Sequence, residues 1–313
     1  MRVARVEIDG AERAALASPD GTSVHLLEQE LGVLDVLLAG DRNAMAIEER
    51  PLEEIRLLAP VDPPTIRDFS VFEQHIEGVI KNSSPEARVP DVWYRSPFCY
   101  FSNPHAVTGP GDEIAIPPSC TDLDLELEVA AVIGRAGTNL RPEEAGNYIA
   151  GYTIFNDWSA RDLQMHELAL GLGFCKAKDF ANTLGPWIVT PDELEPYRDG
   201  DRLDLDMRAR INDRELGDDT LANMAWSFEE LVSYASRGTW IKPGDVLGSG
   251  TCGTGCLLEL RGRHGPEAYP PLKPGDVVSL TVQGIGELTN RVVRGADPIA
   301  LPEARPGRLR ARA

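Results

Sequence analysis

Residues 122–128 alternate carboxylate and leucine without interruption, in the order Asp-Leu-Asp-Leu-Glu-Leu-Glu. A period of two is typical of a β-strand with two different faces, so this pattern predicts a strand with its leucines toward a core and its carboxylates on the opposite face. Neighbouring carboxylates on one face lie about 7 Å apart and raise each other's pKa. A hard divalent cation between two of them would remove the repulsion. The alternative is a solvated acidic face in an acidic protein.

The composition limits the classes of partner. The net charge is -19 over 313 residues, which argues against nucleic acid and against anionic membranes, because both attract cationic surfaces. The five cysteines are an odd number and include no Cys-x-x-Cys pair, which favours reduced thiols and a cytoplasmic location. The sequence shows neither a signal peptide nor an apolar run of about 18 residues, so we expect no membrane partner.

We expect three segments along the chain. Residues 1–61 predict a small N-terminal domain rich in strands, closed by prolines at positions 60, 63 and 64. Residues 62–297 hold all the candidates for chemistry and predict the catalytic domain. Residues 298–313 carry four arginines from Arg305 onward and predict a disordered basic tail.

Polar residues follow a second predicted strand, residues 148–155, abruptly. Residues 156–164 read Asn-Asp-Trp-Ser-Ala-Arg-Asp-Leu-Gln, and the end of a buried strand is where a rigid scaffold presents catalytic groups. The alternative is a helix start with Asn156 or Asp157 as its N-cap, and the two interpretations are compatible. The loop that follows brings Lys178 into a region with few other cations.

His75 lies in a segment with helical periodicity. Apolar residues between positions 71 and 80 recur at the spacing of one helix face, which predicts a helix with His75 on or beside that face. A histidine there is either a base or, more commonly, a core residue that only fills space.

Several separated motifs resemble those of the fumarylacetoacetate hydrolase superfamily, over about residues 62–295. The segment 156–164 resembles the segment that carries the family's third metal ligand, and it is the most specific of the matches. The others are Asp68-Phe69 with His75, Glu126-Leu127-Glu128, Lys178-Asp179-Phe180, Gly185-Pro186-Trp187, and Ser249-Gly250-Thr251 with Glu259.

The resemblance implies a mixed, β-rich α+β fold, namely a β-sandwich roll with a small β-rich N-terminal domain. It also implies a homodimer that acts on a small molecule, with a role in the breakdown of aromatic compounds. The implied cofactor is Mg²⁺, or Mn²⁺ or Ca²⁺ in its place. By the same resemblance Glu126, Glu128 and Asp157 hold the metal, and Asp68 matches a fourth ligand.

The resemblance also implies the other site residues. His75 and Glu259 match a pair that activates water, and Lys178 and Arg161 match residues beside the substrate's oxyanions. Three further residues are assigned to substrate binding: Gln164, Thr251 and Ser70, the last standing where the family's hydrolases carry a tyrosine. Gly78 stands where acylpyruvase-like relatives carry a glutamate.

The first functional hypothesis is a divalent-metal-dependent hydrolase. It would cleave a C–C bond in a 1,3-dioxo or 2-oxo acid, such as fumarylacetoacetate or an acylpyruvate, through a metal-stabilised enolate. The alternative is a lyase or isomerase on a 2-oxo acid, that is, a decarboxylase, hydratase or tautomerase with the same metal site. A catalytically silent metal-binding protein is disfavoured, since it would need only the carboxylates and not His75, Lys178, Arg161 and Gln164.

Overall fold

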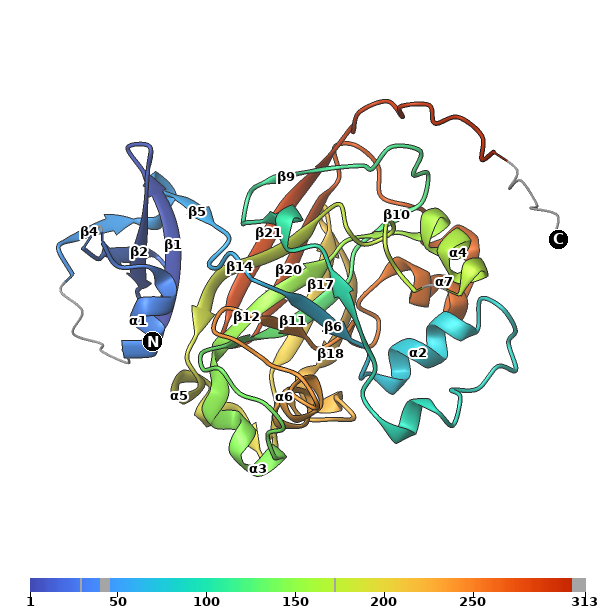
Figure 1. Cartoon of the computed structure of the whole chain (residues 1–313). Coiled ribbons are helices and arrows are strands. Elements are labelled where there is room, and N and C mark those ends of the chain that lie inside the picture. The colour runs from blue at the N-terminus through green and yellow to red at the C-terminus, as the bar shows by residue number, and fades with distance from the viewer. Residues whose placement is uncertain (29, 40–45, 172, 306–313) are drawn as a thin grey trace, which may run out of the picture.

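The protein has a mixed, strand-rich α/β fold, as the sequence predicts. The computed structural model describes residues 1–28, 30–39, 46–171 and 173–305. Long strands fill the centre of the molecule in Figure 1, and a group of helices lies along its right side. These are α2 (Glu73–Ile80), α4 (Arg161–Leu170) and α7 (Leu257–His264). The other α-helices are α1 (Val33–Ala39), α3 (Pro142–Ala145), α5 (Pro191–Leu194) and α6 (Phe228–Ala235). Within the described ranges, no helix has both the length and the apolar character needed to span a bilayer.

A twelve-stranded sheet forms the main layer. Its strands lie in the order β4-β3-β2-β1-β14-β12-β11-β19-β6-β7, while β5 pairs with β1 and β8 with β14. Their bounds are β1 (Arg2–Ile8), β2 (Ala11–Ala17), β3 (Ser23–Leu26), β4 (Glu48–Pro51), β5 (Arg56–Leu58), β6 (Ile66–Phe69), β7 (Cys99–Ser102), β8 (Val107–Thr108), β11 (Leu127–Ile133), β12 (Ile149–Asp157), β14 (Asn182–Val189) and β19 (Val246–Gly248).

A five-stranded sheet lies in the order β18-β17-β20-β21-β9. Two short pairs, β10 with β13 and β15 with β16, complete the strands. The bounds are β9 (Glu113–Ala115), β10 (Leu123–Asp124), β13 (Ser159–Ala160), β15 (Arg198–Asp199), β16 (Arg202–Leu203), β17 (Asp206–Ile211), β18 (Arg214–Thr220), β20 (Val277–Val282) and β21 (Gly286–Val293). The finer description as a β-sandwich roll stays a prediction.

The N-terminal segment continues the main sheet. Strand β1 pairs with β14 through Arg2 and Val3, which lie opposite Val189 and Ile188. Strands β1 to β5 and helix α1 form the left part of the molecule in Figure 1. The boundary of an independent domain at residue 61 stays a prediction. Of the predicted basic tail, residues 298–305 form no helix or strand, and residues 306–313 lie outside the described residues.

Strand β11 contacts two separate cores with its two faces. Leu127 and Val129 belong to the larger hydrophobic cluster, whereas Ala130 and Val132 belong to a smaller one near α1. Successive side chains of a strand point to opposite faces. Glu128 therefore lies on the same face of β11 as Ala130 and Val132, which belong to the smaller core. On this face the strand is acidic only at its start and apolar from Ala130 onward.

The acidic stretch is not one continuous strand. It is split into β10 and β11, and the backbone N–H of Glu126 between them donates to Asn156 Oδ1 at 2.9 Å. The prediction that the leucines face the core is confirmed, since Leu123, Leu125 and Leu127 are all buried. The alternative of a solvated acidic face is wrong, because Asp124, Glu126 and Glu128 are buried as well.

Two predicted helix starts were displaced. Asp157 is not an N-cap but the last residue of β12, where it pairs with Asn182 of β14. Helix α4 begins only at Arg161, because β13 first pairs with β10. Helix α2 begins at Glu73, so Val71 and Phe72 of the predicted helix face precede it.

Helices α2 and α7 contact each other through glycines. A Cβ atom on Gly262 of α7 would lie 2.0 Å from the carbonyl oxygen of Gly78 on α2. A Cβ atom on Gly78 would lie 2.3 Å from Cγ of Glu259. Only residues without side chains permit this distance, so the two glycines bring the backbone that carries His75 next to Glu259.

Replacing Gly262 with alanine should therefore separate the two helices. We expect a loss of about 1–3 kcal/mol of unfolding free energy, the usual cost of overpacking, together with lower activity. Gly146→Ala is the matched control, since its Cβ would lie 3.4 Å from Glu229, an ordinary contact. Thermal unfolding of both variants measures the effect, and equal melting temperatures would contradict the role given to this contact.

Candidate active site

Four buried carboxylates meet at the ends of neighbouring strands. They are the predicted metal ligands Asp68, Glu126, Glu128 and Asp157, and each offers an oxygen within 4.8 Å of the others. Asp68 lies on β6, Glu128 on β11, and β19 runs between these strands. A Cβ atom on Gly248 of β19 would lie 2.4 Å from Asp68 Oδ1 and 2.9 Å from Glu128 Oε2. The glycine therefore leaves the space in which the two carboxylates meet.

Burial and mutual repulsion act on these groups. Burial raises the pKa of Asp68, although its hydrogen bond with Glu128 and the charge of Lys178 act against the rise. Burial and the neighbouring Asp68 raise the pKa of Glu128 well above its usual value. The backbone N–H of Gly250 donates to both carboxylates, at 3.2 Å to Asp68 and 3.0 Å to Glu128.

Lys178 lies between two of the four carboxylates. Its Nζ donates to Glu126 Oε2 at 2.5 Å and to Asp157 Oδ2 at 2.6 Å. Burial by itself would lower the pKa of this amine, but Asp157 and Glu126 raise it above its usual value. Lys178 therefore holds its proton. Burial raises the pKa of Asp157 to about 7, against the opposing effect of Lys178.

Arg161 connects the cluster to helix α7 through Asp124. The guanidinium donates to Asp124 Oδ2 and to Glu126 Oε1, both at 2.8 Å, and to Gln164 Oε1 at 3.1 Å. Asp124 also accepts from the first backbone N–H groups of α7, at 2.8 and 2.9 Å. A carboxylate at a helix N-terminus is favourable. Sequence reasoning did not assign a role to Asp124, because nothing in the acidic alternation distinguishes it from its neighbours.

Tyr100 is a second residue that the sequence did not indicate. Its hydroxyl donates to Asp68 Oδ2 at 2.6 Å and also contacts Asp157. Tyr100 on β7 lies directly opposite Asp68 on β6 in the strand pairing. Only a correct prediction of that pairing would have placed Tyr100 in the site. Ser70, which stands at the family's tyrosine position, uses its backbone carbonyl to accept from Trp93 Nε1 at 2.8 Å.

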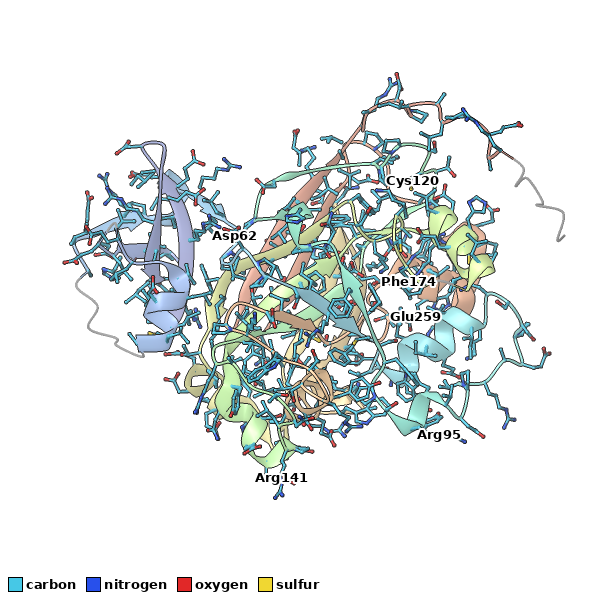
Figure 2. All side chains as sticks on the ribbon, viewed as in Figure 1. Asp62, Arg95, Cys120, Arg141, Phe174 and Glu259 are labelled. Carbon is cyan, nitrogen blue, oxygen red and sulfur yellow. The ribbon has the colours of Figure 1, made fainter. Side chains whose placement is uncertain are left out.

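His75 and Glu259 are brought together as a pair. His75 Nδ1 lies 3.3 Å from Glu259 Oε2, and both side chains are buried. Glu259 also accepts from the backbone N–H of Thr254 and from Arg263 Nε, each at 2.8 Å. The carboxylate is thus fixed on three sides, and it orients the imidazole. In Figure 2 the labelled Glu259 and Phe174 lie on the side of the molecule that carries α2, α4 and α7.

A cavity of about 370 Å³ opens from the carboxylates toward these helices. Eight of the predicted site residues line it: Asp68, Ser70, His75, Glu126, Arg161, Gln164, Lys178 and Thr251. The other three, Glu128, Asp157 and Glu259, lie behind this lining, and Glu259 contacts it through His75. A larger cavity of about 710 Å³, between the β17–β18 hairpin and residues 268–276, contains none of them. The smaller cavity is therefore the candidate active site.

The residues present fit a divalent metal ion. Glu128 Oε1 and Asp157 Oδ1 are buried and have no hydrogen-bond partner among the described residues. An unpaired buried acceptor is costly, and a cation bound to both oxygens would remove that cost. Oxygen donors of this kind suit a hard cation such as Mg²⁺, Mn²⁺ or Ca²⁺. The roles of these residues as ligands stay predictions.

The chain is similar to known proteins over most of its length. Residues 65–293 match the family model described as the fumarylacetoacetate hydrolase C-terminal domain. The oxaloacetate tautomerase YisK of Bacillus subtilis strain 168 is 31% identical over 244 residues, which cover 77% of this chain and 74% of that protein.

Two solved structures show the same fold. The fumarylacetoacetate hydrolase of the psychrophile Exiguobacterium antarcticum is 27% identical, with a TM-score of 0.75 over 94% of this chain and 99% of that one. The 5-carboxymethyl-2-hydroxymuconate delta-isomerase of Mycobacterium smegmatis is also 27% identical, with a TM-score of 0.70 over 94% of this chain and all of that one. These matches agree with the motifs and with the carboxylate cluster, and the chain belongs to the fumarylacetoacetate hydrolase superfamily.

Proposed function

We propose that the protein is a divalent-metal-dependent isomerase that interconverts the keto and enol forms of a 2-oxo acid. The observation that carries this is the cluster of four buried carboxylates, in which two oxygens have no hydrogen-bond partner among the described residues and Lys178 is bound between Glu126 and Asp157 at the inner end of the cavity. The names of the tautomerase and isomerase relatives support it further. Tautomerisation thereby replaces C–C hydrolysis as the first hypothesis. Magnesium as the metal, a homodimer and a cytoplasmic location stay predictions from the sequence.

The reaction needs one proton to change places. It moves between the carbon next to the oxo group and the oxo oxygen, so no further reactant is consumed. When bound, a divalent cation would supply a Lewis acid for the charge that develops on the substrate oxygens. Lys178 Nζ holds a proton between Glu126 and Asp157. It can give this proton to the substrate oxygen and, once neutral, accept the proton from carbon.

C–C hydrolysis is the second candidate, and the His75–Glu259 pair favours it. Hydrolysis requires a base that takes a proton from water. A buried imidazole 3.3 Å from a fixed carboxylate meets that requirement. The solved fumarylacetoacetate hydrolase with the same fold also supports this candidate.

A product assay distinguishes the two reactions. The enol forms of oxaloacetate and of acetylpyruvate should each be converted to the keto form faster than in buffer, as measured by the loss of enol absorbance. Chromatography of the same mixtures should show no cleaved acid. If acetylpyruvate is converted mainly to pyruvate and acetate, the enzyme is instead a hydrolase. If neither substrate reacts faster than in buffer, both candidate reactions are overturned.

Substitution of Lys178 and His75 tests the assigned roles. For tautomerisation we expect Lys178→Gln to reduce kcat by about 10²–10³, as for loss of one oriented donor, and His75→Gln to reduce it by less than about tenfold. For hydrolysis we expect the loss of His75 to have the large effect instead, with His75→Gln reducing kcat by about 10²–10⁴. If His75 only fills space, its substitution lowers the melting temperature and leaves kcat unchanged.

Metal binding has a readout that is independent of activity. The unfolded chain cannot hold the carboxylates together, so Mn²⁺ at a hundredfold excess over its Kd should stabilise the protein by about 2.7 kcal/mol. Glu128→Gln should remove most of this metal-dependent stabilisation without lowering the melting temperature of the metal-free protein, because burial and Asp68 already disfavour the charged form of Glu128 there and glutamine is neutral.

Asp122→Asn is the matched control for Glu128→Gln. Asp122 belongs to the same acidic stretch but pairs with Arg261 at 2.8 Å and lies outside the cluster. Calorimetric titration of wild type and both variants with Mn²⁺ measures the effect. Equal Mn²⁺ affinity in all three proteins would exclude the carboxylate cluster as the metal site.

A further inference from the structure

The active-site cavity is charged at its inner end and apolar at its mouth. The cations that line it within the described chain are Lys178 and Arg161, and both are hydrogen-bonded to carboxylates at the inner end. The outer wall consists of apolar side chains from α2, from α4, from the residue before β7 and from the segment after α4. They are Ile76, Val79, Phe98, Met165, Leu168 and Phe174.

The apolar side chains at the mouth are unusually exposed. Phe98 is 42% exposed, Met165 61% and Leu168 48%. Single exposed apolar residues are common, but a group that rims a concave site marks a binding surface. Exposure of this group costs the free protein stability that a bound apolar ligand would restore.

The rim is connected to the chemical end of the cavity by a ring contact. Phe174 packs edge-on against Tyr100, with ring centroids 5.1 Å apart and an interplanar angle of 86°. The hydroxyl of Tyr100 in turn binds Asp68. A substrate whose oxo acid group reaches the carboxylate cluster would therefore pass these rings and place its far end against Met165 and Leu168.

We propose that the mouth is an apolar subsite that selects 2-oxo acids with an alkyl or aryl far end over those with a second carboxylate. This inference rests on the proposed function. A carboxylate at the mouth would lose water without meeting a free cation among the described lining residues, which is unfavourable. A methylene group of the substrate that binds at the mouth is removed from water. The free energy of this hydrophobic burial should raise kcat/KM about three- to fourfold for each methylene.

The substrate test uses a chain-length series. The kcat/KM for enol-to-keto conversion is measured for acetylpyruvate, butanoylpyruvate, hexanoylpyruvate and benzoylpyruvate, with oxaloacetate as the diacid. We expect kcat/KM to rise about three- to fourfold per methylene until the mouth is filled, and to exceed that for oxaloacetate. A preference for oxaloacetate, or no dependence on chain length, would overturn the subsite.

The introduction of a positive charge tests the location of the subsite. Leu168→Arg places a cation at the mouth and should shift the ratio of kcat/KM toward oxaloacetate by at least about tenfold. Leu38→Arg is the matched control, since Leu38 lies on α1 far from the cavity lining and is 52% exposed. An unchanged ratio in Leu168→Arg, with an altered elution volume in size-exclusion chromatography, would show that the rim is a contact between copies of the chain and would overturn the proposal.

A binding measurement separates this inference from the proposed reaction. N-butyloxamate and N-oxalylglycine carry the same oxamate head and differ in their far end, which is an alkyl group in the first and a carboxylate in the second. Neither can undergo the proposed reaction, because nitrogen stands where the substrate has the carbon that loses its proton. Wild-type protein with Mn²⁺ should bind N-butyloxamate at least about tenfold more tightly, and Leu168→Arg should remove that difference. This preference without turnover of any 2-oxo acid would support the subsite and overturn the reaction; turnover with tighter binding of N-oxalylglycine would overturn the subsite alone.

Discussion

The burial of four carboxylates side by side is the constraint on which the rest of the site depends. Each group lost its water when the strands came together, and unpaired buried charge is costly. Lys178 and Arg161 offset part of the charge, and the amide of Gly250 and the hydroxyl of Tyr100 satisfy some of the oxygens. Two oxygens remain without a partner in the described chain. A cation bound to these two oxygens would complete the arrangement.

The strands make this arrangement rigid. The carboxylates lie on or beside β6, β11 and β12, whose residues are all buried except the half-buried Ala150, so the side chains have few alternative positions. The face of β11 that carries Glu128 becomes part of a hydrophobic core two residues later. The free energy that holds the repelling carboxylates in place is thus supplied by the apolar half of the same strands.

The residues around the carboxylate cluster bear on which of two reactions, tautomerisation or C–C cleavage, the site favours. Stabilised negative charge on a 2-oxo acid serves tautomerisation and C–C cleavage alike. Lys178 is bound within the cluster, whereas the His75–Glu259 pair lies on the helices that cover it. The first suits a proton transfer on the substrate and the second suits activation of water. The apolar mouth adds a separate selection, since it acts on the far end of the substrate and not on the reacting atoms.

The sequence by itself determined the chemical character of the protein. Alternation in residues 122–128 predicted the strand and the burial of its leucines, and the motifs around Asp68, Asp157 and Lys178 predicted which groups the structure brings together. The family, the strand-rich class and the expected ligands of a divalent cation followed from the resemblance of these motifs to those of a known family, whereas the alternation by itself left metal binding as one of two interpretations. The period of the alternation and the spacings within each motif are visible in the sequence, because they involve residues that are neighbours along the chain.

The tertiary structure decided what depends on strand register and on contacts between distant segments. Tyr100 reaches Asp68 only because β7 pairs with β6 in one register, and Gly248 leaves space for two carboxylates only because β19 runs between their strands. Asp124 differs from the other acids of its stretch only through the start of α7. Pairing between strands leaves no period in either strand alone, so these residues carried no signal until the sheet was assembled.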